Sequence, residues 1–153
     1  MIITIDRNEI LQRVKMITAY LAVNHHDAPQ IDDRIAAADS DDDILNTFWL
    51  DACEEARECL RSWLMPTMME TSEEGRGDCL KAVLSFPPRV VTMKQTSITT
   101  ALKAMMTSSI LERWTAITTP EAENRYATEK ESWRNLLARL LCFKPHPRRL
   151  STI

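Results

Sequence analysis

The acidic run Asp39-Ser-Asp-Asp-Asp43 has the residue types of a calcium-binding loop. An EF-hand loop also requires glycine at its sixth position and glutamate at its twelfth. Counted from Asp39, these positions hold Ile44 and Leu50. We therefore exclude an EF-hand. We interpret the run as the start of a helix within a solvated acidic loop, because the positive end of a helix favours carboxylates.

The run His25-His26-Asp27 offers three possible metal ligands in consecutive positions. Adjacent side chains diverge on a helix or a turn, so three in a row rarely close around one ion. The metalloprotease spacing H-E-x-x-H is absent, and the only other histidine is His146. We therefore predict no metal site here and interpret both histidines as residues of a loop or a helix end.

The cysteines are not spaced like those of a zinc or redox site, since no pair has the C-x-x-C spacing. We expect four reduced and mostly buried thiols, as in a cytosolic protein: Cys53, Cys59, Cys79 and Cys142. The nucleophile motif G-x-S-x-G is also absent. A Cys–His pair stays open as an alternative, because spatial neighbours are not visible in a sequence. Our prediction is a non-enzymatic protein without catalytic, cofactor-binding or metal-binding residues.

A short basic tail follows residue 143, and such tails can contact phosphates. Its cations have no interleaved aromatic residues, and the whole chain has a formal charge of −3. We therefore expect a disordered tail and no nucleic-acid partner. No basic region precedes a long apolar run, and no stretch reaches about 18 apolar residues, so we expect no signal peptide, no membrane span and no membrane partner. No residue pattern indicates a small-molecule substrate.

The elements that must position these residues are mainly helices. The chain has 153 residues and only two glycines, which argues against a fold rich in tight β-turns. We predict one helical domain over 1–143 and the tail over 144–153. The stretch from Ile44 to Leu64 should be its central helix, with Ser40 as N-cap and Pro66 just beyond its end. Its apolar stripe is Leu45, Phe48, Trp49, Ala52, Ala56, Leu60 and Trp63.

Three further helices follow from apolar spacing and capping residues. The first should run from Arg7 to Val23, opened by Asp6 and Glu9 as a capping box. The next should begin near Val91 or Thr96 and reach Ile117, and the last should begin at Pro120 with Thr119 as its cap. We predict an all-α, roughly four-helix bundle, with a short two-stranded element if Met1–Ile5 and 79–86 are strands. For 79–86, an amphipathic helix turn remains the alternative.

The segment Asn24–Asp43 should be a long acidic surface loop, with a helical turn near Ile31–Ala38. The methionines near residues 65–69 and 105–106 fit either core filling or an adaptable interface. We predict the following core: Leu11, Val14, Ile17, Leu21, Leu45, Phe48, Trp49, Ala52, Trp63, Leu102, Trp114, Tyr126, Trp133, Leu137 and Leu140.

The segment 108–127 has two features that occur together in a known class of protein. One is the helix end Ile110-Leu-Glu-Arg-Trp114, and the other is the helix start Thr119-Pro-Glu-Ala-Glu-Asn-Arg-Tyr-Ala127, followed by a leucine-rich helix and a basic tail with prolines. Near the N-terminus, Ile5-Asp-Arg-Asn-Glu-Ile10, an acidic loop and Phe48-Trp49 extend the pattern. The sequence thus resembles small helical structural proteins of tailed phages and prophages, most closely over Ser109–Phe143.

This resemblance implies a virion assembly protein, such as a head–tail adaptor or a tail component. It would act through protein–protein contacts with other virion proteins or with itself, as a homo-oligomer. It would reside in the host cytoplasm before its incorporation into a virion. The contact elements would be Met1–Ile5, the acidic loop Asp27–Asp43 and the tail Lys144–Ile153. The pattern carries no catalytic motif, so the resemblance assigns no site residues.

Two other classes of function remain open. A helical binding module unrelated to phages would bury a partner helix or peptide against exposed methionine and leucine side chains. A small enzyme or metal protein would have a deep pocket in which His25 or His26 lies beside carboxylates.

Overall fold

The computed structural model describes residues 1–24, 35–64 and 78–142, and all structural statements below concern these residues. They form a short sheet and four long helices. The strands are β1 (Ile2–Asp6) and β2 (Cys79–Val83), and the helices are α1 (Arg7–Asn24), α3 (Asp42–Leu60), α4 (Pro88–Thr118) and α5 (Pro120–Leu141). The predicted fold class is confirmed: the protein is mainly helical, with one two-stranded element.

The sheet joins the N-terminus to the middle of the chain. Strands β1 and β2 are antiparallel, with Ile2 opposite Val83 and Asp6 opposite Cys79. Alternate residues point inward, so that Ile3, Ile5, Leu80 and Ala82 are buried. Residues 79–83 are therefore strand, and Met1–Ile5 is a packed strand rather than an exposed arm.

With Ser40 as its N-cap the central helix was expected to begin at Asp41; it begins one residue later, at Asp42, and ends at Leu60, four residues earlier than predicted. Ser40 is not its N-cap, because Asp39–Asp41 form a 3-10 turn and Asp41 precedes the helix. The cause is local: the Asp41 carboxylate accepts a hydrogen bond from the backbone N–H of Ala38 at 2.9 Å, which closes this turn. After Leu60 the chain continues as a second 3-10 turn, Arg61–Trp63.

Helix α4 begins at Pro88, earlier than either predicted start. Strand β2 already ends at Val83, and proline fits the first turn of a helix, where its missing N–H leaves no hydrogen bond unmade. Buried hydroxyl groups are frequent along this helix. Thr107 and Thr115 each donate to the carbonyl four residues earlier, at 2.8 and 2.7 Å. These bonds explain how the helix tolerates so many serines and threonines.

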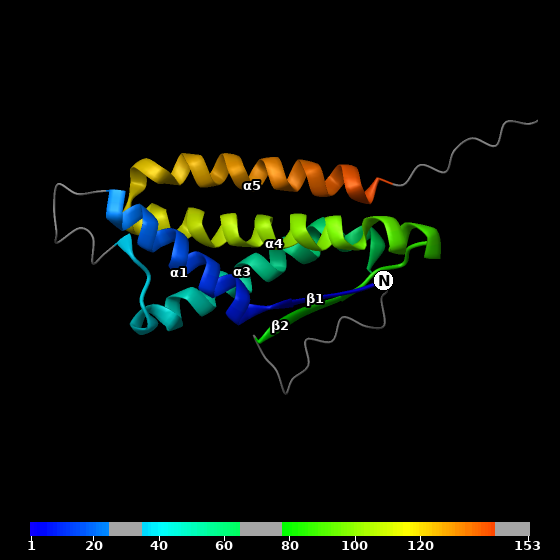
Figure 1. Cartoon of the computed structure of the whole chain (residues 1–153), viewed down its shortest axis with the longest axis horizontal. Coiled ribbons are helices and arrows are strands. Elements are labelled where there is room, and N and C mark those ends of the chain that lie inside the picture. Colours follow the sequence, from blue (N-terminus) through cyan, green and yellow to red (C-terminus); the bar gives the residue numbers. More distant parts are fainter. Residues whose placement is uncertain (25–34, 65–77, 143–153) are drawn as a thin grey trace, which may run out of the picture.

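Helix α5 begins at Pro120, as predicted, and ends at Leu141. Thr119 occupies the capping position, but its side chain makes no capping hydrogen bond. Its hydroxyl instead donates to the hydroxyl of Thr118 at 3.4 Å. One residue thus separates α4 from α5, and Figure 1 shows the two helices lying side by side in opposite directions.

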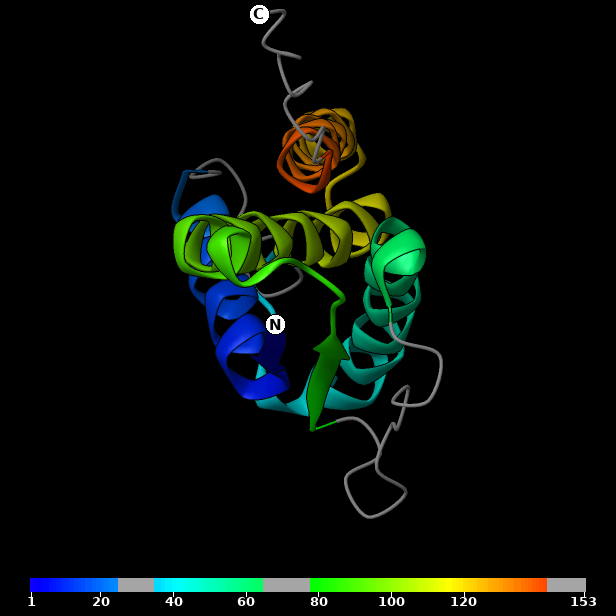
Figure 2. The same cartoon turned by 90° about the vertical axis from the view of Figure 1, so that its right-hand side faces the viewer.

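Helix α4 forms the middle layer of the molecule. Figure 2 shows α5 on one side of it, and α1, α3 and the sheet on the other. Each neighbour of α4 can therefore bury an apolar stripe against it, which is what an amphipathic helix requires for stability. None of the described helices is long and apolar enough to cross a membrane.

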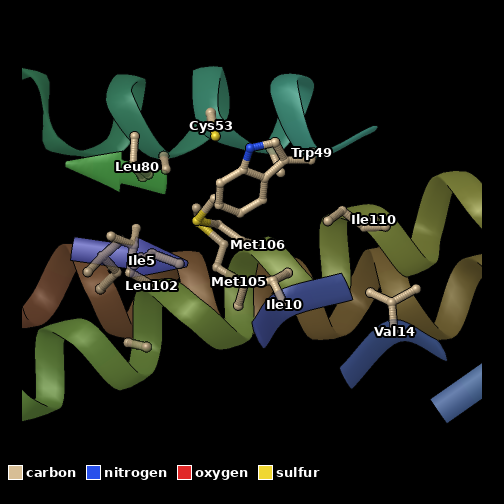
Figure 3. Close-up of a cluster of buried hydrophobic side chains, with 14 of the residues drawn as sticks. Ile5, Ile10, Val14, Trp49, Cys53, Leu80, Leu102, Met105, Met106 and Ile110 are labelled. Carbon is tan, nitrogen blue, oxygen red and sulfur yellow. The ribbon is translucent and has the colours of Figure 1, made fainter. Parts of the chain in front are cut away.

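The core lies between α4 and the layer formed by α1, α3 and the sheet. Figure 3 shows Trp49 of α3 beside Met106 and Cys53 at its centre. Met105 and Met106 are buried, so this methionine pair fills the core. Nine of the fifteen predicted core residues are fully buried, and six pack against the core while partly exposed: Ile17, Leu21, Phe48, Trp63, Trp133 and Leu140.

Two expectations about burial were wrong. Ile117, an apolar residue at the predicted end of α4, is 61% exposed although Trp114 and Thr115 in the same turn are buried, so it lies on the side of α4 that no other helix covers. The acidic loop is not wholly on the surface, because Ile35 and Ala37 are buried. Ile35 accepts a hydrogen bond at its carbonyl from Trp114 Nε1 at 2.7 Å, which anchors this segment to α4. Residues 25–34 lie outside the described part of the chain.

Candidate functional site

A polar cluster between α3, α4 and α5 has the residue types that catalysis uses. Ser109 on α4 is fully buried, and its hydroxyl donates to Glu55 Oε2 of α3 at 3.0 Å. Arg113 donates from Nη1 to Ser109 Oγ at 2.6 Å and from Nη2 to Glu55 Oε1 at 2.6 Å. The hydroxyl thus has both a donor and an acceptor within the chain. A buried hydroxyl held in this way links helices and is not presented to a substrate.

Helix α5 joins the same cluster through Lys130. Its Nζ lies 2.6 Å from Glu112 Oε2 and 3.7 Å from Glu55 Oε2. Arg113 Nε also lies 3.7 Å from Asp51 Oδ2. Three carboxylates and two cations therefore offset one another across three helices, so we assign this cluster a stabilising role. No local signal in the sequence could reveal that Arg113, 58 residues further along, is the partner of Glu55.

The acidic residues of the calcium-like run are held by the chain itself. Lys15 Nζ donates to Asp39 Oδ1 at 2.9 Å and to Asp42 Oδ1 at 3.0 Å. These hydrogen bonds raise the pKa of Lys15 above its usual value. Within the described ranges, no group of three or more His, Cys, Asp or Glu side chains is placed to hold a metal ion. His25, His26 and Asp27 lie outside those ranges, so the Cys–His alternative is not tested for them.

The cysteines are less uniformly buried than predicted. Cys53 is buried, and this burial raises the pKa of its thiol to about 12, which keeps it protonated and unreactive. Cys59 is half-buried, and its Sγ lies 3.7 Å from Met105 Sδ. The expectation of burial was wrong for Cys79 and Cys142, which are exposed because they lie at the ends of β2 and α5.

An apolar groove runs between the first half of α4 and the second half of α5. Its volume is about 330 Å³ and it is open to solvent. Its lining contains no ionisable side chain, and consists of Thr96, Ser97, Thr100, Ala101, Trp133, Leu136 and Leu140. Pockets that bind small polar ligands place several polar groups at fixed positions, whereas this lining suits an apolar side chain of another protein.

The outer face of α1 carries three large apolar side chains in a row. Met16, Tyr20 and Val23 are 57%, 68% and 58% exposed. Their spacing of four and three residues places them on one stripe, opposite the stripe that packs on the core. Three adjacent exposed apolar side chains are typical of a protein contact surface, since single ones are common but rows are not.

The three predicted contact elements have different outcomes. Met1–Ile5 belongs to the sheet, and only part of Asp27–Asp43 is described. The tail Lys144–Ile153 lies outside the described residues, and so do Met65, Met68 and Met69. The α1 stripe and the α4–α5 groove were not predicted as contact surfaces. In the sequence, Met16, Tyr20 and Val23 are apolar residues outside the predicted core, which is the only signal for the α1 stripe. Trp133 and Leu140 of the groove were predicted as core, and only the structure shows that they are partly exposed.

Comparison of the chain with models of protein families, with curated proteins and with solved structures finds no match in any of the three.

Proposed function

We propose that this protein is a non-enzymatic assembly subunit of a tailed-phage or prophage virion, as a head–tail adaptor or tail component. The observation that carries the proposal is the exposed row Met16, Tyr20 and Val23, a helix face suited to packing against another protein. The resemblance of residues 109–143 to phage structural proteins supplies the biological setting. The protein would be present in the host cytoplasm until it enters the particle.

The polar contacts are compatible with this role. Glu55, Arg113 and Lys130 tie three helices together, and Lys15 holds the turn before α3. An assembly subunit needs such internal links because its surface must keep one shape while partners bind to it. The groove and the α1 stripe then offer apolar surface on a rigid framework.

The proposal is tested in the organism that encodes the chain. Phage particles are induced, purified by density gradient and searched for peptides of this protein by mass spectrometry. We expect the protein in the particles, and we expect deletion of its gene to leave heads and tails unjoined or tails incomplete. Particles that lack the protein, together with an unchanged phage yield from the deletion strain, would overturn the proposal.

A partner-binding module outside phages is the second candidate, and the α1 stripe also favours it. Such a module would gain thermal stability when its partner binds, because a ligand that binds only the folded state stabilises it. Tyr20→Ser would abolish that gain without lowering the melting temperature of the isolated protein, since Tyr20 is 68% exposed. The same variant in the phage setting would reduce incorporation into particles instead.

A further inference from the structure

The two ends of the molecule carry opposite charge. Figure 1 shows the turn before α3 and the turn between α4 and α5 at one end of the long axis, and the start of α4 and the end of α5 at the other. We call the first the acidic end; its carboxylates are Asp39, Asp41, Asp42, Asp43, Glu121 and Glu123. We call the second the basic end; its cations are Arg89, Lys94 and Arg139. No acidic residue occurs from Cys79 to Leu111.

Several of these end charges have no partner within the described part of the chain. Asp43, Glu121 and Glu123 form no ion pair there, and neither do Arg89 and Arg139. The side chains of the helix-linking cluster are paired with one another instead. The end charges therefore remain available to a partner of opposite sign.

Each end also carries apolar surface, a groove at the basic end and an exposed side chain at the acidic end. The groove of Trp133, Leu136 and Leu140 lies at the basic end, and Lys94 borders it by donating to the carbonyl of Leu140 at 3.2 Å. At the acidic end, Ile117 projects from the last turn of α4 and is 61% exposed. One end thus has an apolar hollow among cations, and the other has an exposed apolar side chain among carboxylates.

We propose that the protein associates head to tail with copies of itself. The acidic end of one copy packs against the basic end of the next, and Ile117 enters the α4–α5 groove. Opposite charges around an apolar contact raise the rate of encounter and set its orientation. Because the two surfaces differ, the contact is heterologous, and repeated use of it gives a closed ring or an open filament. This inference deepens the proposed function by naming a second copy as the partner.

The first experiment measures the mass of the protein by light scattering over a hundredfold range of concentration. It is done at low and high salt, on the order of 0.02 M and 0.5 M, because the higher concentration shortens the reach of surface charges to a few Å. We expect the mass to rise with concentration at low salt and to fall toward the monomer at high salt. A wild-type protein that is monomeric throughout would overturn the proposal and leave the groove to a different protein or another segment of the chain.

Charge reversal then tests the pairing of the ends. One variant carries Arg89→Glu, Lys94→Glu and Arg139→Glu, so that both of its ends are acidic. A second carries Asp43→Lys, Glu121→Lys and Glu123→Lys, so that cations outnumber carboxylates at both of its ends once Lys15 is counted with Asp39 and Asp42. The association of each variant should weaken by at least about 100-fold. An equimolar mixture should associate again with both variants in equal amounts. The variant with all six changes, whose net charge equals that of the wild type, should associate alone. If both paired variants associate as well as the wild type, the ends are not the contact.

The groove is tested separately by filling it. Thr100 is exposed and lines the groove, so Thr100→Trp should block Ile117 and weaken association by at least about tenfold. Thr128→Trp is the matched control, because Thr128 is an exposed threonine on α5 that belongs neither to the lining nor to the basic end. Equal association of both variants and the wild type would overturn the role of the groove. Circular dichroism confirms that each variant is folded.

These outcomes differ from those of the particle experiment. A protein that is found in virions but stays monomeric in solution retains the proposed function and loses the head-to-tail contact. A protein that forms rings or filaments but is absent from particles retains the contact and loses the phage role.

Discussion

Two buried tryptophans in this protein differ in one hydrogen bond, which allows a sharp test of the core. Trp49 is 1% exposed, and its Nε1 has no hydrogen-bond partner among the described residues. Trp114 is 5% exposed, and its Nε1 donates to the Ile35 carbonyl at 2.7 Å. Replacing each with phenylalanine removes the same atoms from two similar environments but has opposite effects on hydrogen bonding.

The expected magnitudes follow from two terms. Exchanging tryptophan for phenylalanine removes roughly 40 Å³, which costs about 1 kcal/mol at about 24 cal/mol per Å³ of cavity. Trp114→Phe also leaves the buried Ile35 carbonyl unpaired, which adds about 1–3 kcal/mol. Trp49→Phe instead removes a buried N–H that had no hydrogen-bond partner. Removing this unpaired donor is favourable and reduces the free-energy cost of the cavity. We expect a loss of about 2–4 kcal/mol for Trp114→Phe and at most about 1 kcal/mol for Trp49→Phe.

Urea unfolding followed by far-ultraviolet circular dichroism measures both changes without relying on tryptophan fluorescence, which the substitutions alter. Trp49→Ala serves as a positive control and should cost about 3–5 kcal/mol, because it removes the whole buried ring. Equal losses for the two phenylalanine variants, or a larger loss for Trp49→Phe, would refute the assignment of these hydrogen bonds.

Three further predictions concern the polar contacts and the buried thiol. Glu55→Gln should lower the free energy of unfolding in urea by about 1.5–3 kcal/mol, because it weakens hydrogen bonds to Arg113. The exposed control Glu54→Gln should change the free energy of unfolding by less than about 1 kcal/mol. Equal effects of the two substitutions would contradict the contact between Glu55 and Arg113. Cys53 should react with a thiol reagent only as the protein unfolds, because burial raises its pKa to about 12, and rapid labelling in the native state would contradict this. Since hydrogen bonds to two carboxylates raise the pKa of Lys15 above 10.5, its contribution to stability is complete below that pH and is lost as the pH rises through the folded-state pKa. The difference in urea midpoint between wild type and Lys15→Met should therefore be constant from neutral pH to about 10 and shrink above it. A difference in midpoint that stays the same above this pH would argue against the hydrogen bonds from Lys15 to Asp39 and Asp42.

Much of the secondary structure was predictable because it depends on neighbouring residues. The boundaries of α1 followed from a capping box and a regular apolar stripe, and Pro120 marked the start of α5. For residues 79–86 the sequence left a strand and a helix turn open, and the pairing of Cys79–Val83 with β1 shows that the strand is correct. Errors occurred where a local rule had two outcomes. Helix α4 begins at Pro88, before the predicted starts at Val91 or Thr96, because proline also fits the first turn of a helix. Asp41 rather than Ser40 precedes α3, because a 3-10 turn comes first.

The candidate contact surfaces could not be predicted in the same way. Ile117 fits the apolar spacing of α4 but is exposed, because it lies on the side of the last turn opposite the buried Trp114 and Thr115. Glu55 lies on a charged face yet pairs with residues 54 and 58 positions away. The groove exists only because Trp133 and Leu140 of α5 lie beside Thr96 and Thr100 of α4.

The sequence by itself determined a mainly helical protein with a short sheet, because helix periodicity, proline positions and capping residues act over three or four neighbours along the chain. It also placed seven aspartates within 27–43 and no acidic residue from Cys79 to Leu111. Only the tertiary structure decided that α4 is the middle layer, that the charges gather at opposite ends, and that an apolar groove lies beside the cations. The physical reason is that these features come from packing between residues tens of positions apart, and such packing leaves no periodic signal in the sequence.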